Sequence, residues 1–474
     1  MLFCSQLFLL FFVAVFVAYW AMPWQRARVW LLLVASFYFY ASWSQWLATI
    51  VCVSTLVDYL AARGMDADLS TRWRRVLLGL SLAMNLGLLV YFKYANFFLR
   101  SLEDALTAVG ATASLPVLSV ILPIGISFYT FEAINYTVDV YRRRIPAEKN
   151  LAHFMLFILF FPHLIAGPIV RARDFLPQIR RRKRWDWARM NLGVQLFLLG
   201  MFKKLAIADR MAQFADPVFS APGDYRTAVL WLAMLAWAMQ VYCDFSGYSD
   251  MALGTAHLLG YKLAKNFDMP YLAPNIADFW RRWHISLSNW LRDYLFIPLG
   301  GSRGTRWQTC RNLMITMTLG GLWHGANWPY VAFGVLHGLL LSGHRAFREF
   351  CQRRPGLAAV LQTFPGTALR VAVTFTIFCL TLVVFRCPSL SAGGTMLSHM
   401  FTRHKGAGLP LAEIGLWLTV AVVAAGHALG YRGRWQFVME RMPSPARGFA
   451  YASLLSLALL LSPDASKAFI YFQF

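Results

Sequence analysis

Charge is the property that this sequence most lacks. Only 14% of its 474 residues are charged and 58% are hydrophobic, whereas roughly a quarter of residues are charged in soluble domains. Several runs without charge exceed the ~20 residues that cross a bilayer. These features exclude a soluble globular protein. They predict an all-α polytopic membrane protein, because helices satisfy their own backbone groups in lipid.

Acidic residues are scarcer than basic ones, 22 against 45, and the formal net charge is +23. In a soluble domain this excess would suggest a nucleic-acid partner. Here the basic residues lie in short segments between apolar runs, where they set topology and meet lipid headgroups. We therefore expect membrane lipids and no nucleic acid as partners. The basic segment 171–189 is expected in the cytosol, and the uncharged segment 1–6 predicts a periplasmic N-terminus.

Signatures of other classes are missing. The seven cysteines are scattered without a CxxC spacing, so neither a metal site nor a disulfide is expected. No GxGxxG or Walker-type loop is present, which gives nucleotide-driven transport no support. The apolar run 2–20 has no basic region before it and no cleavage site after it, so we expect a first span. The apolar runs together predict 11 to 13 transmembrane and re-entrant helices.

The longest uncharged run lies between Arg311 and Arg345. A single helix over these 33 residues (312–344) would be ~50 Å long, well beyond the ~30 Å hydrocarbon core. The glycine pair at 320–321 and the segment 325–329 therefore predict a break in the helix.

This break places His324 near the middle of the membrane, with Trp323 and Asn327 beside it. An ionisable side chain at that depth is a candidate functional residue. The alternative is a neutral core histidine that is hydrogen-bonded to a carbonyl group.

A second polar concentration covers 278–294. Trp280, His284, Ser288 and Leu291 recur at helical spacing and would share one face. The charge of this segment is too high for a spanning helix, so we expect an interfacial or re-entrant helix that lines a cavity. A surface helix that only anchors the protein is the alternative. Further cavity candidates in this segment are Arg281, Trp283, Arg292 and Asp293.

Two shorter polar segments complete the candidates. Asp244, Ser246 and Asp250 follow an apolar run, and the carboxylates could form an acid/base pair or a cation site. Structural pairing with the arginines at 281, 282 or 292 is favoured. His163 lies between two prolines in an apolar span, where a kinked tunnel wall explains it as well as catalysis does.

Six motifs occur in one order: SFYTF (127–131), FPHLIAGP (161–168), DFSGYSD (244–250), FWRRWHISLS (279–288), WLRDY (290–294) and GGLWHG (320–325). Together they closely resemble the membrane-bound O-acyltransferases, and within them the branch that O-acetylates alginate, cellulose and other bacterial exopolysaccharides. The resemblance runs from about residue 120 to 345, and the closing FIYFQF (469–474) is similar to that branch.

The resemblance implies a ring of tilted helices around a funnel, with the acyl donor entering from the cytosol and the acceptor from the other side. It implies one integral-membrane domain over 1–474, with peripheral helices in 1–115, the catalytic core in 120–345 and C-terminal helices in 346–474. His324 matches the catalytic histidine of the family and His284 its second histidine. Many relatives that acylate lipids or proteins carry Asn at the second position, so His284 favours the polysaccharide branch.

Acetyl transfer from a thioester to an alcohol requires a group that accepts the hydroxyl proton, and neutral imidazole suits this task. We expect His324 to act as the base or as a transient acyl carrier. We expect His284 to orient the donor or stabilise the oxyanion. Arginines in 180–184 would suit the phosphates of acetyl-CoA.

The expected function is O-acetyl transfer from acetyl-CoA across the bacterial inner membrane, through a periplasmic acetyltransferase partner, to an exopolysaccharide of the alginate or cellulose type. No bound cofactor is expected. Two alternatives stay open. One is transfer of D-alanine to teichoic acid, and the other is a secondary transporter whose histidines relay protons.

Overall fold

The computed structural model describes residues 3–111, 114–410, 412–462 and 469. Across these residues the regular structure is helical, with one isolated bridge between Tyr225 and Ala407 and no longer strand. The predicted all-α class is therefore confirmed. The chain forms two compact units, Met1–Phe197 with Met251–Ala264, and Leu198–Asp250 with Lys265–Phe474.

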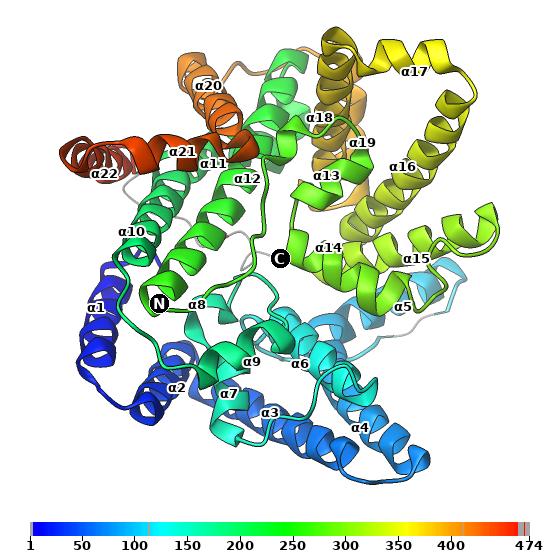
Figure 1. Cartoon of the computed structure of the whole chain (residues 1–474). Coiled ribbons are helices and arrows are strands. Elements are labelled where there is room, and N and C mark those ends of the chain that lie inside the picture. Colours follow the sequence, from blue (N-terminus) through cyan, green and yellow to red (C-terminus); the bar gives the residue numbers. More distant parts are fainter. Residues whose placement is uncertain (1–2, 112–113, 411, 463–468, 470–474) are drawn as a thin grey trace. The chain divides into compact units, whose positions relative to one another are not determined.

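The helices that begin in the first unit (blue to cyan-green in Figure 1) are α1 (Gln6–Ala21), α2 (Gln25–Ala41), α3 (Gln45–Asp66), α4 (Thr71–Leu89), the π-helix η1 (Val90–Tyr94), α5 (Ala95–Ala108), α6 (Ile126–Tyr141), α7 (Leu151–Leu159), α8 (Phe161–Leu164), α9 (Ala172–Arg180) and α10 (Trp187–Phe202).

Those that begin in the second unit are the π-helix η2 (Lys203–Ala208), α11 (Asp209–Ser220), η3 (Pro222–Asp224), α12 (Thr227–Leu258), η4 (Pro270–Leu272), α13 (Ile276–Arg282), α14 (Ile285–Leu291), the π-helix η5 (Arg292–Phe296), α15 (Arg306–His324), α16 (Trp328–Gln352), α17 (Pro355–Gln362), α18 (Phe364–Arg386), α19 (Leu390–Phe401), α20 (Glu413–Gly430), η6 (Tyr431–Gly433), α21 (Arg434–Arg441) and α22 (Ser444–Leu460).

Six helical stretches in the described residues are long and apolar enough to cross a membrane: Gln45–Asp66, Thr71–Ala108, Trp187–Ser220, Thr227–Leu258, Phe364–Arg386 and Glu413–Gly433. They agree with the predicted multi-pass membrane protein. The total of 11 to 13 membrane elements, the central funnel and the subdivision at residues 115 and 345 stay predictions.

The predicted break in the long uncharged run is confirmed. The first helix, α15, starts at a capping box in which Thr305 and Gln308 each accept the other's backbone N–H, and it ends at His324. Gly325 is extended, and α16 begins at Trp328 with a proline in its first turn. The break leaves His324 as the last residue of α15, and Figure 1 shows α15 and α16 as two separate helices.

Two glycines bring α15 and α16 into backbone contact. A Cβ atom on Gly321 would lie 2.8 Å from Cα of Gly334, and a Cβ on Gly334 would lie 2.8 Å from Cα of Thr318. Neither position has room for a side chain. The position of His324 is therefore fixed by direct packing of two helix backbones.

The expectation that Trp280, His284, Ser288 and Leu291 share one helical face is wrong. The segment forms two short helices, α13 and α14, and His284 between them adopts a left-handed conformation with φ 44° and ψ 53°. A left-handed residue ends the helical repeat. His284 therefore points in a direction that helical periodicity does not predict.

Candidate functional site

Two histidines, on different elements of the second unit, form the centre of the candidate site. The ring centroids of His284 and His324 lie 6.4 Å apart, with 60° between the ring planes. His284 is 0% exposed and His324 is 6% exposed. At this separation, both rings are within hydrogen-bond reach of one small group. A small reacting group between them could therefore contact both.

Aromatic side chains surround this pair. The ring of Phe245 lies 4.6 Å from His284, and Trp323 lies 5.7 Å from it. On the other side, His324 contacts Phe385 at 5.4 Å and Phe333 at 6.3 Å. Such a shell excludes water and strengthens electrostatic interactions within the site.

Asn266 holds the unusual backbone at His284. Its main-chain oxygen accepts the N–H of Ile285 at 2.9 Å. Its side-chain oxygen accepts the N–H and the hydroxyl of Ser286 at 3.2 and 2.9 Å, and lies 3.3 Å from Nδ1 of His284. No motif in the sequence indicated this residue, because it is 18 positions away in a connecting segment.

The charge state of His284 follows from this environment. His284 lies between two short helices, outside the six candidate spans. Burial first, and then the neighbouring His324, hold the pKa of His284 well below its usual range. Both effects penalise the imidazolium ion, so His284 is neutral in the resting site.

A chain of hydrogen bonds positions Trp280. Its indole N–H donates to Nδ1 of His337 at 3.2 Å, so Nε2 of His337 carries the proton and donates to Oγ1 of Thr381 at 3.1 Å. The Thr381 hydroxyl in turn donates to the carbonyl of Phe378 at 2.7 Å. The role of His337 here is to fix α13 against α16 and α18, and no motif indicated it.

The prediction that arginines pair with the carboxylates of Asp244 and Asp250 is wrong. Lys204 Nζ lies 2.7 Å from Asp244 and 2.8 Å from Asp209, and Lys203 Nζ lies 2.6 Å from Asp250. The reason is a close helix approach, since a Cβ on Gly247 of α12 would lie 3.1 Å from Cβ of Lys203. The lysine pair within an apolar run was the signal that could have identified these partners.

The neighbouring arginines have partners of their own. Arg282 pairs with Asp278 and Arg292 with Asp293, each at 2.7 Å, and Arg281 is exposed.

The structure shows the following contacts for the remaining candidates. Ser246 is buried on α12. Trp283 packs on Phe378, with ring centroids 5.3 Å apart, and its carbonyl accepts the Ser288 hydroxyl at 3.3 Å. Asn327 donates from Nδ2 to the carbonyl of Pro388 at 3.1 Å. The structure thus brings His284, His324 and Trp323 into one site.

His163 belongs to the first unit and has a different environment. Its Nε2 lies 3.1 Å from Oε2 of Glu132, and each side chain is 1% exposed. The other carboxylate oxygen of Glu132 accepts the backbone N–H of Val170 at 2.8 Å. This pair ties α6 to the bend of α8 and the segment after it, which agrees with the structural interpretation of the motif.

A helical multi-pass chain with two neighbouring, buried histidines has the features of a membrane acyltransferase. The model of the membrane-bound O-acyltransferase family matches residues 2–385. The chain belongs to this family and is an acyltransferase.

Known relatives agree with this assignment. The chain is 38% identical over its whole length to the "Probable alginate O-acetylase AlgI" of Pseudomonas putida, covering 100% of both chains. It is 36% identical to the "Peptidoglycan O-acetyltransferase" of Helicobacter pylori over 79% of this chain and 73% of the relative. It is 29% identical to the "Teichoic acid D-alanyltransferase" of Bacillus subtilis over 55% of this chain and 68% of the relative.

Proposed function

We propose that this acyltransferase moves acetyl groups from cytosolic acetyl-CoA across the membrane for the O-acetylation of an exopolysaccharide. The observation that carries the proposal is the buried pair of His284 and His324 at 6.4 Å. The names of the relatives support transfer of an acyl group to a polymer of the cell envelope. Two of the three names specify acetyl transfer, which favours acetyl-CoA over an alanyl donor.

In the proposed reaction, His324 accepts the proton of the acceptor hydroxyl while the oxygen attacks the thioester carbonyl. The C–S bond then breaks, and the leaving thiolate takes up the proton from His324. Neutral imidazole suits both transfers, and general-base catalysis contributes about 10²–10⁴ in rate. The same groups would serve if His324 briefly carried the acetyl group.

The hydrogen bonds of His284 indicate its part. Because the side-chain oxygen of Asn266 accepts from Ser286, it is an acceptor toward Nδ1 of His284 as well. Neutral His284 therefore holds its proton on Nδ1 and presents the lone pair of Nε2. In this state Nε2 accepts a hydrogen bond and can therefore orient a hydroxyl group. It can stabilise an oxyanion only after it has gained a proton.

The proposed setting is the bacterial inner membrane, with the N-terminus in the periplasm. A polymer assembled outside the cytosol cannot reach cytosolic acetyl-CoA, so we include a periplasmic acetyltransferase that completes the transfer. The acceptor is alginate or a related polymer such as cellulose. Labelled acetyl-CoA, given to membranes with each purified polymer, would identify the acceptor.

The decisive variant is His324→Ala in the full-length protein. We expect loss of acetyl transfer by a factor of about 10²–10⁴, with normal accumulation in the membrane. The matched control is His344→Ala, on α16, which should retain wild-type transfer. Wild-type acetylation by the His324 variant would refute the mechanism.

The transporter alternative makes an opposite prediction. If the chain carried a substrate by relaying protons, vesicles containing the purified protein would show proton-dependent uptake without acetyl-CoA turnover. We expect turnover of acetyl-CoA that depends on His324.

A further inference from the structure

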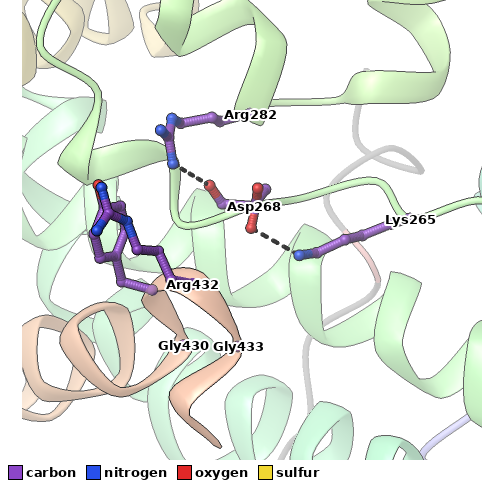
Figure 2. A pocket seen from close by; sticks show the side chains of 7 residues that line it. Lys265, Asp268, Arg282, Gly430, Arg432 and Gly433 are labelled. Carbon is purple, nitrogen blue, oxygen red and sulfur yellow. Dashed lines mark hydrogen bonds and ion pairs between the residues drawn. The ribbon is translucent and has the colours of Figure 1, made fainter. Parts of the chain in front are cut away.

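A second polar site lies at the end of α20, which is also the end of a candidate membrane span. It is a cavity of about 350 Å³ lined by Lys265, Asp268, Arg282 and residues 430–433 (Figure 2). No motif of the sequence indicated a site here. The end of a span lies at the water boundary of the membrane, where a water-soluble ligand can arrive.

The lining of this cavity is net positive. Lys265, Arg282 and Arg432 contribute three cations, and Asp268 contributes one carboxylate. Lys265 Nζ is 2.7 Å from Asp268, and Arg282 donates from Nη1 to the carbonyl of Asp268 at 3.3 Å (Figure 2). Arg282 also pairs with Asp278 through Nε. Among the described side chains, Arg432 has no ion pair, so its charge is available to a ligand.

One aromatic ring lies near two of the basic side chains. The Tyr431 ring centroid lies 5.2 Å from the guanidinium of Arg432 and 6.0 Å from that of Arg282, so one ring supports both cations. Arg432 has a φ of 56°, a left-handed conformation that a non-glycine residue adopts at a cost. Strained residues of this kind concentrate at ligand-binding positions.

The cavity and His284 lie on the same two paired segments of backbone. The N–H of Asp268 donates to the carbonyl of Arg282, and the N–H of Ile285 donates to the carbonyl of Asn266, each at 2.9 Å. Residues 266–268 thus pair with 282–285 and carry cavity residues together with His284. Arg282 and His284 are two residues apart, at most about 7 Å along the backbone.

We propose that this cavity binds phosphate ester groups, and that its ligand is the phosphate-bearing part of the acyl donor. This inference rests on the proposed function for the identity of the donor. Guanidinium groups bind phosphate through paired hydrogen bonds, and two of them line this cavity. Because Arg282 and His284 belong to one chain segment, phosphate bound at Arg282 and Arg432 brings the rest of the donor close to His284.

The test compares Arg432→Gln with the control Arg434→Gln, a neighbouring exposed arginine that does not line the cavity. In the purified full-length protein, Arg432→Gln should raise KM for acetyl-CoA about tenfold, the effect of one charged hydrogen bond, with kcat unchanged. The control should match wild type. With acetyl-pantetheine, a donor without phosphate, both variants should match wild type. An unchanged KM for acetyl-CoA in Arg432→Gln would overturn the inference.

A second variant tests the sign of the charge effect. Asp268→Asn removes the one carboxylate among the described lining residues and releases Lys265. It should therefore lower KM for acetyl-CoA and tighten competitive inhibition by inorganic pyrophosphate. Weaker inhibition by pyrophosphate would contradict an anion site.

Two further outcomes distinguish the donor's phosphate from that of a lipid headgroup. If Arg432→Gln left KM unchanged but weakened binding to phosphatidylglycerol nanodiscs relative to phosphatidylcholine nanodiscs, the phosphate would belong to lipid and the assignment to the donor would fail. If wild type turned over neither donor, the proposed function would fail. Pyrophosphate binding that Arg432→Gln weakens would then still support a phosphate site.

Discussion

Two buried histidines in this chain have opposite surroundings. His163 of the first unit faces the carboxylate of Glu132 at 3.1 Å. His284 of the second unit faces the amide oxygen of Asn266 at 3.3 Å and has a second imidazole nearby. A carboxylate stabilises an imidazolium ion, whereas an amide next to another imidazole does not.

In the proposed mechanism, this difference separates a structural histidine from a reactive one. A histidine paired with a buried carboxylate is committed to that partner, and here the pair also holds the backbone of Val170. A neutral histidine beside an amide oxygen carries its proton on the nitrogen that faces the amide and its lone pair on the other nitrogen. The type of neighbour, more than depth in the protein, therefore indicates which histidine acts in the reaction.

The strongest test of this contrast is His284→Ala. We expect the rate of acetyl transfer to fall by about 10² or more, with wild-type amounts of protein in the membrane. Initial rates with labelled acetyl-CoA would measure the loss. A wild-type rate would reduce His284 to a structural residue like His163.

A smaller effect is expected when the neighbour of His284 is made to resemble that of His163. In Asn266→Asp, a carboxylate beside Nδ1 raises the pKa of His284 from its depressed value. His284 then stays protonated to higher pH, so the rate should fall about tenfold at one pH unit below the raised pKa and recover as pH increases.

The pH profile of kcat/KM measures this shift in pKa. The acidic limb of the profile should move to higher pH. Asn266→Ala is the control, since it removes the side-chain acceptor beside Nδ1 of His284 without adding a charge. An equal shift in both variants would contradict an electrostatic cause.

The smallest effect on activity is expected for Glu132→Gln. Glutamine can still accept the backbone N–H of Val170 but places an amide group, in place of a carboxyl group, opposite His163. We expect a loss of stability of about 1–3 kcal/mol, seen as a lower thermal unfolding midpoint, and a rate per folded molecule within about twofold of wild type. A large loss of rate without a change in midpoint would assign His163 to catalysis.

The sequence supported the helical class and the break at His324, because both follow from long-range hydropathy and glycine placement. It failed where contacts between distant segments decide the outcome. The left-handed turn at His284 depends on Asn266, and the charge partners of Asp244 and Asp250 depend on how closely α12 approaches the preceding helix. No periodicity within one segment contains that information.

The ion pairs of Lys203 with Asp250 and Lys204 with Asp244 also have a consequence for biogenesis. They join two consecutive candidate spans, Trp187–Ser220 and Thr227–Leu258. A lone Lys or Asp at the centre of an inserting helix costs roughly 2.5–3.5 kcal/mol. Because each span carries the counter-ions of the other, insertion of the two as one hairpin avoids leaving these charges unpaired in lipid.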